Sequence, residues 1–182
     1  KFKYEPQKAM SEETAYLITD MLITATKNGV GGNLKVSGTE IGSKTGTSTY
    51  SSEAIKKYGV KSSASKDNWT AYYSPDYSIA IWYGYDQLMT KHYTTALSGA
   101  SEKKKISTLL GNKIFKKNSK FKKPSNIITV DYELETIPLQ SPSEFTPEDL
   151  IDSEKFKKGT EPAEVSNRFA RLENPTNGKA TS

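Results

Sequence analysis

The chain has 182 residues, a net charge of +5 and a hydrophobic share of 34%. That share is lower than is usual for a compact globule, so we expect a packed core over only part of the chain. No run of about 18 consecutive apolar residues occurs, so we expect no transmembrane helix, and the first residues lack the apolar segment of a signal peptide. Because the sequence opens on Lys1 rather than methionine, we expect it to begin partway through a longer protein. The absence of cysteine excludes disulfides, thiolate metal sites and cysteine nucleophiles, and a single histidine, His92, excludes most histidine-based sites.

The charges are unevenly distributed along the chain. Residues 101–123 hold nine lysines and one acid, Glu102, whereas residues 131–164 hold ten acids and three lysines. Only Arg168 and Arg171 are arginines, and this disfavours sequence-specific recognition of nucleic acid, which relies on bidentate arginine contacts. The lysine-rich segment therefore faces either solvent or an anionic polymer, and composition leaves both possibilities open.

The first part of the chain predicts a helix, a turn and a strand. Ser11 is a candidate N-cap with two glutamates behind it, and apolar residues follow at helical spacing up to Asn28. The glycine-rich residues 29–32 are predicted to form a plain turn. Residues 39–50 are rich in β-branched side chains and predict a strand, and the polar residues 51–67 predict a surface loop.

The next part predicts a hairpin and a second helix. Two β-rich runs, 68–73 and 77–85, flank the turn sequence Ser74-Pro75-Asp76 and should pair antiparallel. Residues 102–117 predict a helix whose lysines face solvent. Its predicted buried stripe consists of Ile106, Leu109, Leu110 and Ile114. Beyond residue 119 the pattern weakens, although Thr146-Pro147 is a good local helix start and residues 157–182 have the composition of a tail. The element order indicates the α+β class, an antiparallel sheet with flanking helices.

The tetrapeptide Lys44-Thr45-Gly46-Thr47 lies on the predicted strand 39–50 and could carry chemistry. Gly46 allows a ligand to lie against the backbone, Lys44 offers a positive charge, and the two threonine hydroxyls can bind a carboxylate. A backbone N–H beyond the glycine could stabilise a developing oxyanion. These groups suit acyl transfer on a peptide that ends in a carboxylate. A threonine-rich strand with a solvated lysine is the alternative interpretation.

The chain resembles the C-terminal part of a class A penicillin-binding protein of the Gram-positive type. The tetrapeptide matches that family's third active-site motif. Five further stretches resemble the family in the same order, so the resemblance covers nearly the whole chain. They are Ser11 to Met21, Asp67-Asn68-Trp69, residues 74–85, and the stretches 145–149 and 156–162.

The resemblance implies the C-terminal half of a beta-lactamase/transpeptidase-like fold with an extended tail. On this basis we expect residues 1–118 to belong to the transpeptidase domain, 119–160 to form a post-domain extension and 161–182 a linker or tail. The implied function is that of a serine DD-transpeptidase, which cross-links D-Ala-D-Ala stem peptides of peptidoglycan and binds beta-lactams. Lys44 would be the catalytic cation and Thr45, Gly46 and Thr47 the substrate-binding residues, with no cofactor or metal. The implied location is the extracellular face of the cytoplasmic membrane, with an anchor upstream of this chain.

The family also needs S-x-x-K, which carries the nucleophile, and S-x-N before the K-T-G motif. Neither precedes Lys44 here, and the three S-x-x-K strings that occur begin after it, at Ser63, Ser101 and Ser119. We therefore expect the nucleophile on an upstream half of the same domain, and we expect the isolated chain to be inactive. Ser43 and Tyr72 stand where the family usually has glycine.

Two other functions stay open from the sequence. The lysines of residues 101–123 could make the chain a binding module for an anionic polymer such as nucleic acid or teichoic acid, although under the transpeptidase interpretation no nucleic acid is expected as a partner. Alternatively, the chain could be a non-catalytic fragment of marginal stability, since half a domain leaves a sheet face or edge uncovered.

Overall fold

The computed structural model describes residues 5, 7–28 and 34–169, so the predicted glycine-rich turn lies outside the described residues. The chain divides into two compact units, with the division between Lys123 and Pro124. Within the described residues no helix is both long and apolar enough to cross a bilayer. The domain boundaries predicted after residues 118 and 160 stay predictions.

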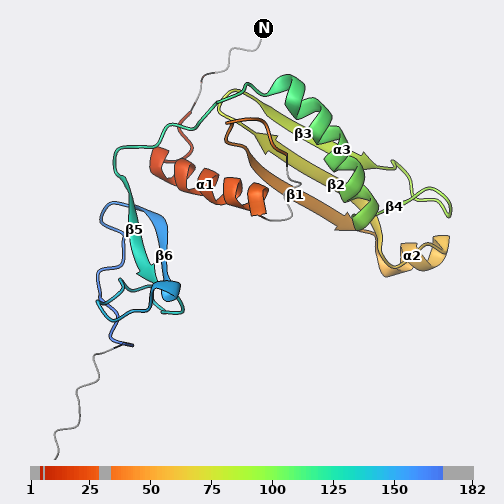
Figure 1. Ribbon diagram of the computed structural model, residues 1–182. Coiled ribbons are helices and arrows are strands. Elements are labelled where there is room, and N and C mark those ends of the chain that lie inside the picture. The colour runs from red at the N-terminus through yellow and green to blue at the C-terminus, as the bar shows by residue number, and fades with distance from the viewer. Residues whose placement is uncertain (1–4, 6, 29–33, 170–182) are drawn as a thin grey trace, which may run out of the picture. The chain divides into compact units, whose positions relative to one another are not determined.

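The first unit is built on an antiparallel sheet with the strand order β1-β2-β3 (Figure 1). Its strands are β1 (Gly42–Thr49), β2 (Ala64–Tyr73), β3 (Ser78–Gly84) and the two-residue β4 (Thr94–Thr95), which pairs with the start of β2. The hairpin predicted from the sequence is present, with β2 and β3 paired over their shared length. Its turn is closed by the Ser74 N–H, which donates to the Tyr77 carbonyl over 2.8 Å. The predicted α+β class with an antiparallel sheet and flanking helices is confirmed.

The two faces of this sheet have different surroundings. Residues directly opposite one another share a face, which places Ser43, Tyr72 and Ile79 on one side together with the buried Thr70 and Ile81. This side holds the core, whose members are Leu34, Val36, Ile41, Tyr72, Ile81 and Phe115. The other side carries Ala71 and Ala80, and both are exposed. We call these the covered face and the open face.

Ser43 and Tyr72, the two departures from the family pattern, are paired with each other across β1 and β2. Both are buried on the covered face. The Ser43 hydroxyl accepts a hydrogen bond from the Thr26 hydroxyl over 2.8 Å. The two substitutions are therefore accommodated within one regular register.

Helix α1 (Glu12–Asn28) begins where the sequence predicted, and the Thr14 N–H donates to the Ser11 hydroxyl as expected of an N-cap. It lies beside β1 (Figure 1). A short helix, α2 (Ser52–Tyr58), occupies part of the region predicted as a loop. Ser51 caps its N-terminus and Gly59, in the left-handed region at φ 62°, ends it. The loop prediction for residues 51–67 was therefore wrong over α2 and over the start of β2.

Helix α3 (Ala96–Ile114) starts six residues earlier than predicted, at a capping box formed by Thr95 and Ser98. Its buried residues are Gly99, Lys103, Ser107 and Gly111, at successive turns. The predicted stripe was wrong for Leu109, which is 67% exposed, and for Leu110 and Ile114, although Ile106 packs against the core.

The reason for this difference is close packing at the glycines. A Cβ added to Gly99 would lie 2.4 Å from the Asn68 side chain, and one added to Gly111 would lie 2.6 Å from Leu34. Small residues thus allow the helix to approach the covered face, and the leucines turn outward. The prediction that the lysines of this helix face solvent was also wrong for Lys103.

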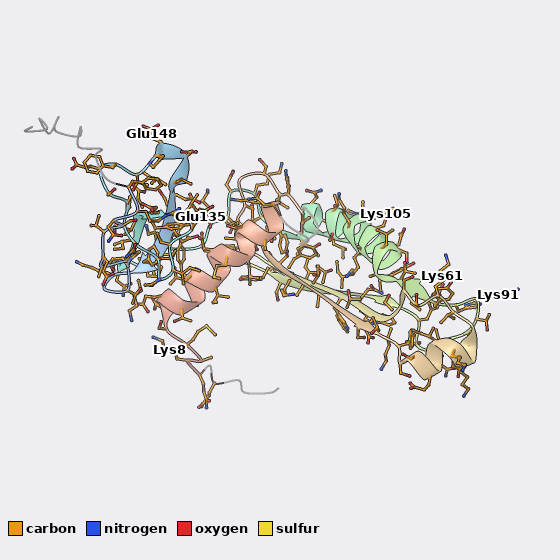
Figure 2. All side chains as sticks on the ribbon, turned by 90° about the horizontal axis from the view of Figure 1, so that it is seen from below. Lys8, Lys61, Lys91, Lys105, Glu135 and Glu148 are labelled. Carbon is orange, nitrogen blue, oxygen red and sulfur yellow. The ribbon has the colours of Figure 1, made fainter. Side chains whose placement is uncertain are left out.

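The second unit contains a two-stranded antiparallel sheet that the sequence analysis did not predict. Its strands are β5 (Ile127–Glu133) and β6 (Ile151–Lys157), and a single turn of 3-10 helix, η1 (Glu148–Leu150), precedes β6. The helix start predicted at Thr146 leads only to this short turn, which has no side-chain cap. The Thr146 hydroxyl instead accepts a hydrogen bond from the Ser143 N–H and donates one to the buried Glu133 carboxylate. Figure 2 labels two acidic residues of this unit, Glu135 and Glu148.

Candidate active site

The tetrapeptide Lys44–Thr47 lies in the middle of β1, a strand at the edge of the sheet. On one side its residues pair with Asn68–Ala71 of β2. On the other side, no strand of the described chain pairs with β1. An unpaired edge presents backbone N–H and C=O groups that can bind an extended peptide by adding a strand.

Alternation along β1 separates the lysine from the threonines. Lys44 and Gly46 lie on the open face, whereas Thr45 and Thr47 lie on the covered face, near the edge. The Lys44 ammonium is exposed and donates a hydrogen bond to the Thr45 carbonyl over 2.8 Å. Among the described residues it forms no ion pair. The Lys44 ammonium is thus available to bind an anion, and no described residue encloses it on the side away from β1.

Gly46 is not required by packing within the sheet. A Cβ added there would lie 3.7 Å from the Trp69 Cβ, an ordinary contact, and would meet no other atom nearby. An alanine would therefore fit the described structure. A requirement for glycine at this position must come from a molecule or segment that lies against β1.

A carboxylate fixes the strands at the end of the tetrapeptide. Asp67 accepts a hydrogen bond from the Ser48 hydroxyl over 2.6 Å and another from the Trp82 indole over 3.0 Å. Both bonds lower the pKa of Asp67, and the bond from Ser48 has the larger effect. Because Ser48, Asp67 and Trp82 belong to β1, β2 and β3, one ionised group joins all three strands directly after Thr47.

The open face also carries both tryptophans of the chain. Trp69 is paired with Gly46 on one side and with Trp82 on the other, so the three residues form a row across the sheet. Trp69 is 48% exposed and Trp82 36%. The row lies next to the row that contains Lys44, Ala71 and Ala80.

The structure thus brings Lys44, Thr45, Gly46 and Thr47 to a sheet edge that no described strand pairs with and that α1 flanks near Ser43, with the cation and the hydroxyls on opposite faces of the strand. Sequence reasoning missed the Asp67 bridge and the residues behind the motif, Asn68 and Lys103. Asp67 and Asn68 were noticed only as part of a resemblance, and Lys103 is hidden in a run of three lysines. The three S-x-x-K strings begin before β2, on α3 and after α3, and the Ser119 hydroxyl is engaged by Asp76.

Comparison with known proteins identifies related chains. Residues 1–116 match the sequence profile described as the penicillin binding protein transpeptidase domain. Penicillin-binding protein 1A/1B of Bacillus subtilis (strain 168) is 31% identical over 173 residues, which is 95% of this chain and 19% of that protein. Penicillin-binding protein 1A of Streptococcus pneumoniae (strain ATCC BAA-255 / R6) is 36% identical over 97 residues, 52% of this chain and 13% of that protein.

A third relative, penicillin-binding protein 1F of Bacillus subtilis (strain 168), is 29% identical over 139 residues, 76% of this chain and 18% of that protein. The chain therefore spans about a fifth or less of the length of these relatives. The profile ends within the first unit, whereas the match to the 1A/1B protein is long enough to extend into the second.

Proposed function

The chain belongs to the penicillin-binding protein transpeptidase domain family, and from this premise we propose that β1 forms one wall of the active site of a serine D-Ala-D-Ala transpeptidase. The observation that supports the proposal most strongly is the position of Lys44–Thr47 on an unpaired sheet edge with an exposed ammonium. The family match alone supports a penicillin-binding transpeptidase of cell wall synthesis. The assignment to this tetrapeptide rests on its geometry.

In this proposal the donor stem peptide lies extended along the free edge of β1. Its terminal carboxylate is bound by the Lys44 ammonium and by the hydroxyls of Thr45 and Thr47. These groups flank the edge from its two sides and can converge on an anion placed at the edge itself. Gly46 leaves space on the open face for the peptide backbone to come close.

The reaction has two acyl-transfer steps. The oxygen of an active serine attacks the carbonyl carbon of the first D-Ala, an ester forms, and the terminal D-Ala leaves with the proton of the serine. The amine of a neighbouring stem peptide then attacks the ester, an amide forms, and the serine regains its proton. The Thr47 N–H supplies one donor to the oxyanion of each tetrahedral intermediate, and loss of such a donor typically slows a reaction by about 10²–10³. Lys44 stabilises the negative charge and supports proton movement.

The serine and the S-x-N motif belong, in this proposal, to an upstream half of the same domain. That half covers the open face near Lys44 and completes the cleft. Beta-lactams imitate the donor and acylate the same serine. The proposed location is the extracellular face of the cytoplasmic membrane, where the substrate is found, and the isolated chain is proposed to be inactive.

The test is to join the chain to the upstream half of its domain and to add a labelled penicillin. We expect one label per molecule, and peptide mapping should place it on a serine that precedes Lys1. No uptake by the joined, folded protein would refute the proposal, and so would a label on a serine within the 182 residues. The isolated chain is the control and should take up none.

Binding of an anionic polymer through the lysines of residues 101–123 has less support from the structure. At least four of these nine lysines are engaged within the protein. Lys103 is buried, Lys105 pairs with Glu102, Lys116 pairs with Asp76, and Lys120 lies 3.8 Å from Glu40. Teichoic acid binding that weakens steeply with salt would nevertheless favour this alternative.

A further inference from the structure

Helix α3 buries one lysine of a run of three. Lys103 is only 4% exposed, whereas Lys104 and Lys105, the latter labelled in Figure 2, are exposed. The Lys103 ammonium donates a hydrogen bond to the backbone carbonyl of Trp69 over 2.9 Å. The side chain therefore crosses the interface between α3 and the covered face and ends at the backbone of β2.

This arrangement is unfavourable for a residue with a merely space-filling role. Within the described chain no carboxylate pairs with Lys103, and burial lowers the pKa of its ammonium. Burying a charge with only a neutral partner is expensive, and an aliphatic side chain could fill the same position without that penalty. Groups whose pKa is shifted by burial are concentrated at functional sites.

The backbone that Lys103 contacts lies directly behind the tetrapeptide. Trp69 is paired with Gly46, and its neighbour Asn68 is paired with Thr47. One helical turn before Lys103, Gly99 lies against the Asn68 side chain. Two successive residues on the inner side of α3 thus hold the part of β2 that determines where Gly46 and Thr47 lie.

Asn68 is itself fixed from a third direction. It is fully buried, and its amide nitrogen donates to the hydroxyls of Ser65 and Thr94 over 2.9 and 3.0 Å. The side chain can therefore move little in response to a change at α3. The hydrogen bond from Lys103 to the Trp69 carbonyl joins α3 directly to this stretch of backbone.

We propose that Lys103 is a positioning residue for the active site: through the Trp69 carbonyl it holds the Gly46–Thr47 backbone where it can meet the substrate. The proposal rests on the proposed function of the tetrapeptide. It adds a residue that never touches the substrate but controls the distance between β1 and the reacting carbonyl. Misplacement of reacting groups by about 1 Å can slow an enzyme about 10²-fold.

The kinetic test compares Lys103→Met with Lys104→Met, an exposed neighbour, in the chain joined to the upstream half of its domain. We expect Lys103→Met to lower the second-order rate constant of acylation by a labelled penicillin about tenfold or more, while the label per folded molecule stays at one. A merely structural role would reduce the label per molecule and leave the rate constant of the labelled fraction unchanged. Lys104→Met should match the wild type, and an unchanged rate constant in Lys103→Met would overturn the proposal.

Lys103→Gln is the second variant, in case Lys103→Met does not fold. It keeps a neutral donor that reaches less far, so we expect an intermediate rate constant at full labelling, and a rate constant equal to the wild type would count against the proposal.

Hydrogen exchange separates this proposal from the proposed function. In the same variants, we expect backbone amides of residues 42–49 to exchange about tenfold faster in Lys103→Met, while those of α1 do not change. If the wild type takes up no penicillin, the proposed function fails, and this measurement still tests whether Lys103 holds β1. Unchanged exchange over residues 42–49 would show that it does not.

Discussion

Glu133 is the most deeply buried charged residue in the described part of the second unit, at 0% exposure. Its carboxylate accepts hydrogen bonds from the hydroxyls of Thr146 over 2.6 Å and Ser166 over 2.9 Å, and Arg168 lies 3.3 Å away. Three segments distant in sequence therefore meet at one side chain. The two hydroxyls and the guanidinium together stabilise the buried carboxylate, and this identifies Glu133 as a structural anchor.

We expect Glu133→Gln to lower the free energy of unfolding of the second unit by about 3 kcal/mol, because the amide removes the buried charge that pairs with Arg168 and replaces one of the two acceptor oxygens with a donor. Denaturant-dependent hydrogen exchange of residues 127–133 measures this. Glu135→Gln is the matched control, since Glu135 pairs with the same arginine but is 73% exposed, and it should cost less than about 1 kcal/mol. Equal losses in the two variants would contradict the assignment of Glu133 as an anchor.

Asp76 connects the hairpin turn to the segment that follows α3. Its carboxylate accepts hydrogen bonds from Lys116 over 2.8 Å and from the Ser119 hydroxyl. The pKa of Asp76 is held below its usual value, chiefly by the hydrogen bond from Lys116 and next by the bond from Ser119. The positive charge of Lys116 adds to this effect. The contribution of Asp76 to stability is therefore present above about pH 4, the ordinary pKa of the unfolded chain, and is lost as the pH falls through the lower folded value.

The expected result is a difference in Tm between the wild type and Asp76→Asn that is largest at pH 6 and shrinks toward pH 3. Thermal melts at several pH values provide the measurement. Asp86→Asn changes an exposed carboxylate after β3 and should show a small difference at every pH. A difference for Asp76→Asn that does not vary with pH would contradict the role of its ionised form.

At the scale of elements, the packing of α3 on the sheet depends on glycine. Replacing glycine by alanine inside a helix normally stabilises it by about 1 kcal/mol. At Gly99 the added Cβ would lie within 2.8 Å of three side-chain atoms of Asn68, a residue that Ser65 and Thr94 hold in place. We expect Gly99→Ala to destabilise the first unit by about 1–3 kcal/mol, as measured by urea titration.

Ser101→Ala, at an exposed position of the same helix, is the control for helix propensity. It should be neutral or slightly stabilising. If Gly99→Ala were also stabilising, the close approach of α3 to β2 would be disproved.

The elements differ in how well the sequence predicts them, for physical reasons. The hairpin was predictable because Ile79, Ile81 and Tyr83 alternate with exposed residues and a strong turn sequence separates the runs. The buried stripe of α3 was not predictable from hydrophobicity. Close approach to a sheet favours small residues on the helix, whereas a rule based on hydrophobicity selects the leucines. Strand β5 carries β-branched residues that could have been recognised, whereas the charges of β6 hide its pairing.

The candidate site shows a similar division. Its four residues were predicted from chemistry and resemblance, and their common strand was predicted from β-branched content. Tertiary pairing determines the rest. It makes β1 an edge strand, places Lys44 and the threonines on opposite faces, and turns Lys103 inward. Local sequence patterns carry no information of this kind.

At the scale of the whole molecule, the open face exposes large aromatic side chains of the first unit. Trp69 and Trp82, the only two tryptophans of the chain, are both substantially exposed there. The outer edge of β3, a strand without charged residues, is also unpaired among the described residues. Such edges and faces usually acquire a partner or promote aggregation.

We therefore expect tryptophan emission of the isolated chain to have its maximum near that of a solvated indole, and to shift to shorter wavelength when the proposed upstream half of the domain is joined. Trp69→Phe and Trp82→Phe variants assign the shift to each residue. Emission that is the same in the isolated and joined proteins would show that the upstream half leaves this face uncovered.

The proposed function of β1 as a wall of the active site is tested most directly at Lys44. In the joined protein, we expect Lys44→Met to lower the rate constant of acylation by a labelled penicillin by at least about 10², because the exposed ammonium is the only cation of the tetrapeptide that can bind the carboxylate and stabilise the developing charge. Lys113→Met, on the exposed side of α3, should acylate at the wild-type rate, and all three proteins should have the same Tm. A Lys44→Met protein that is acylated as fast as the wild type would contradict the account.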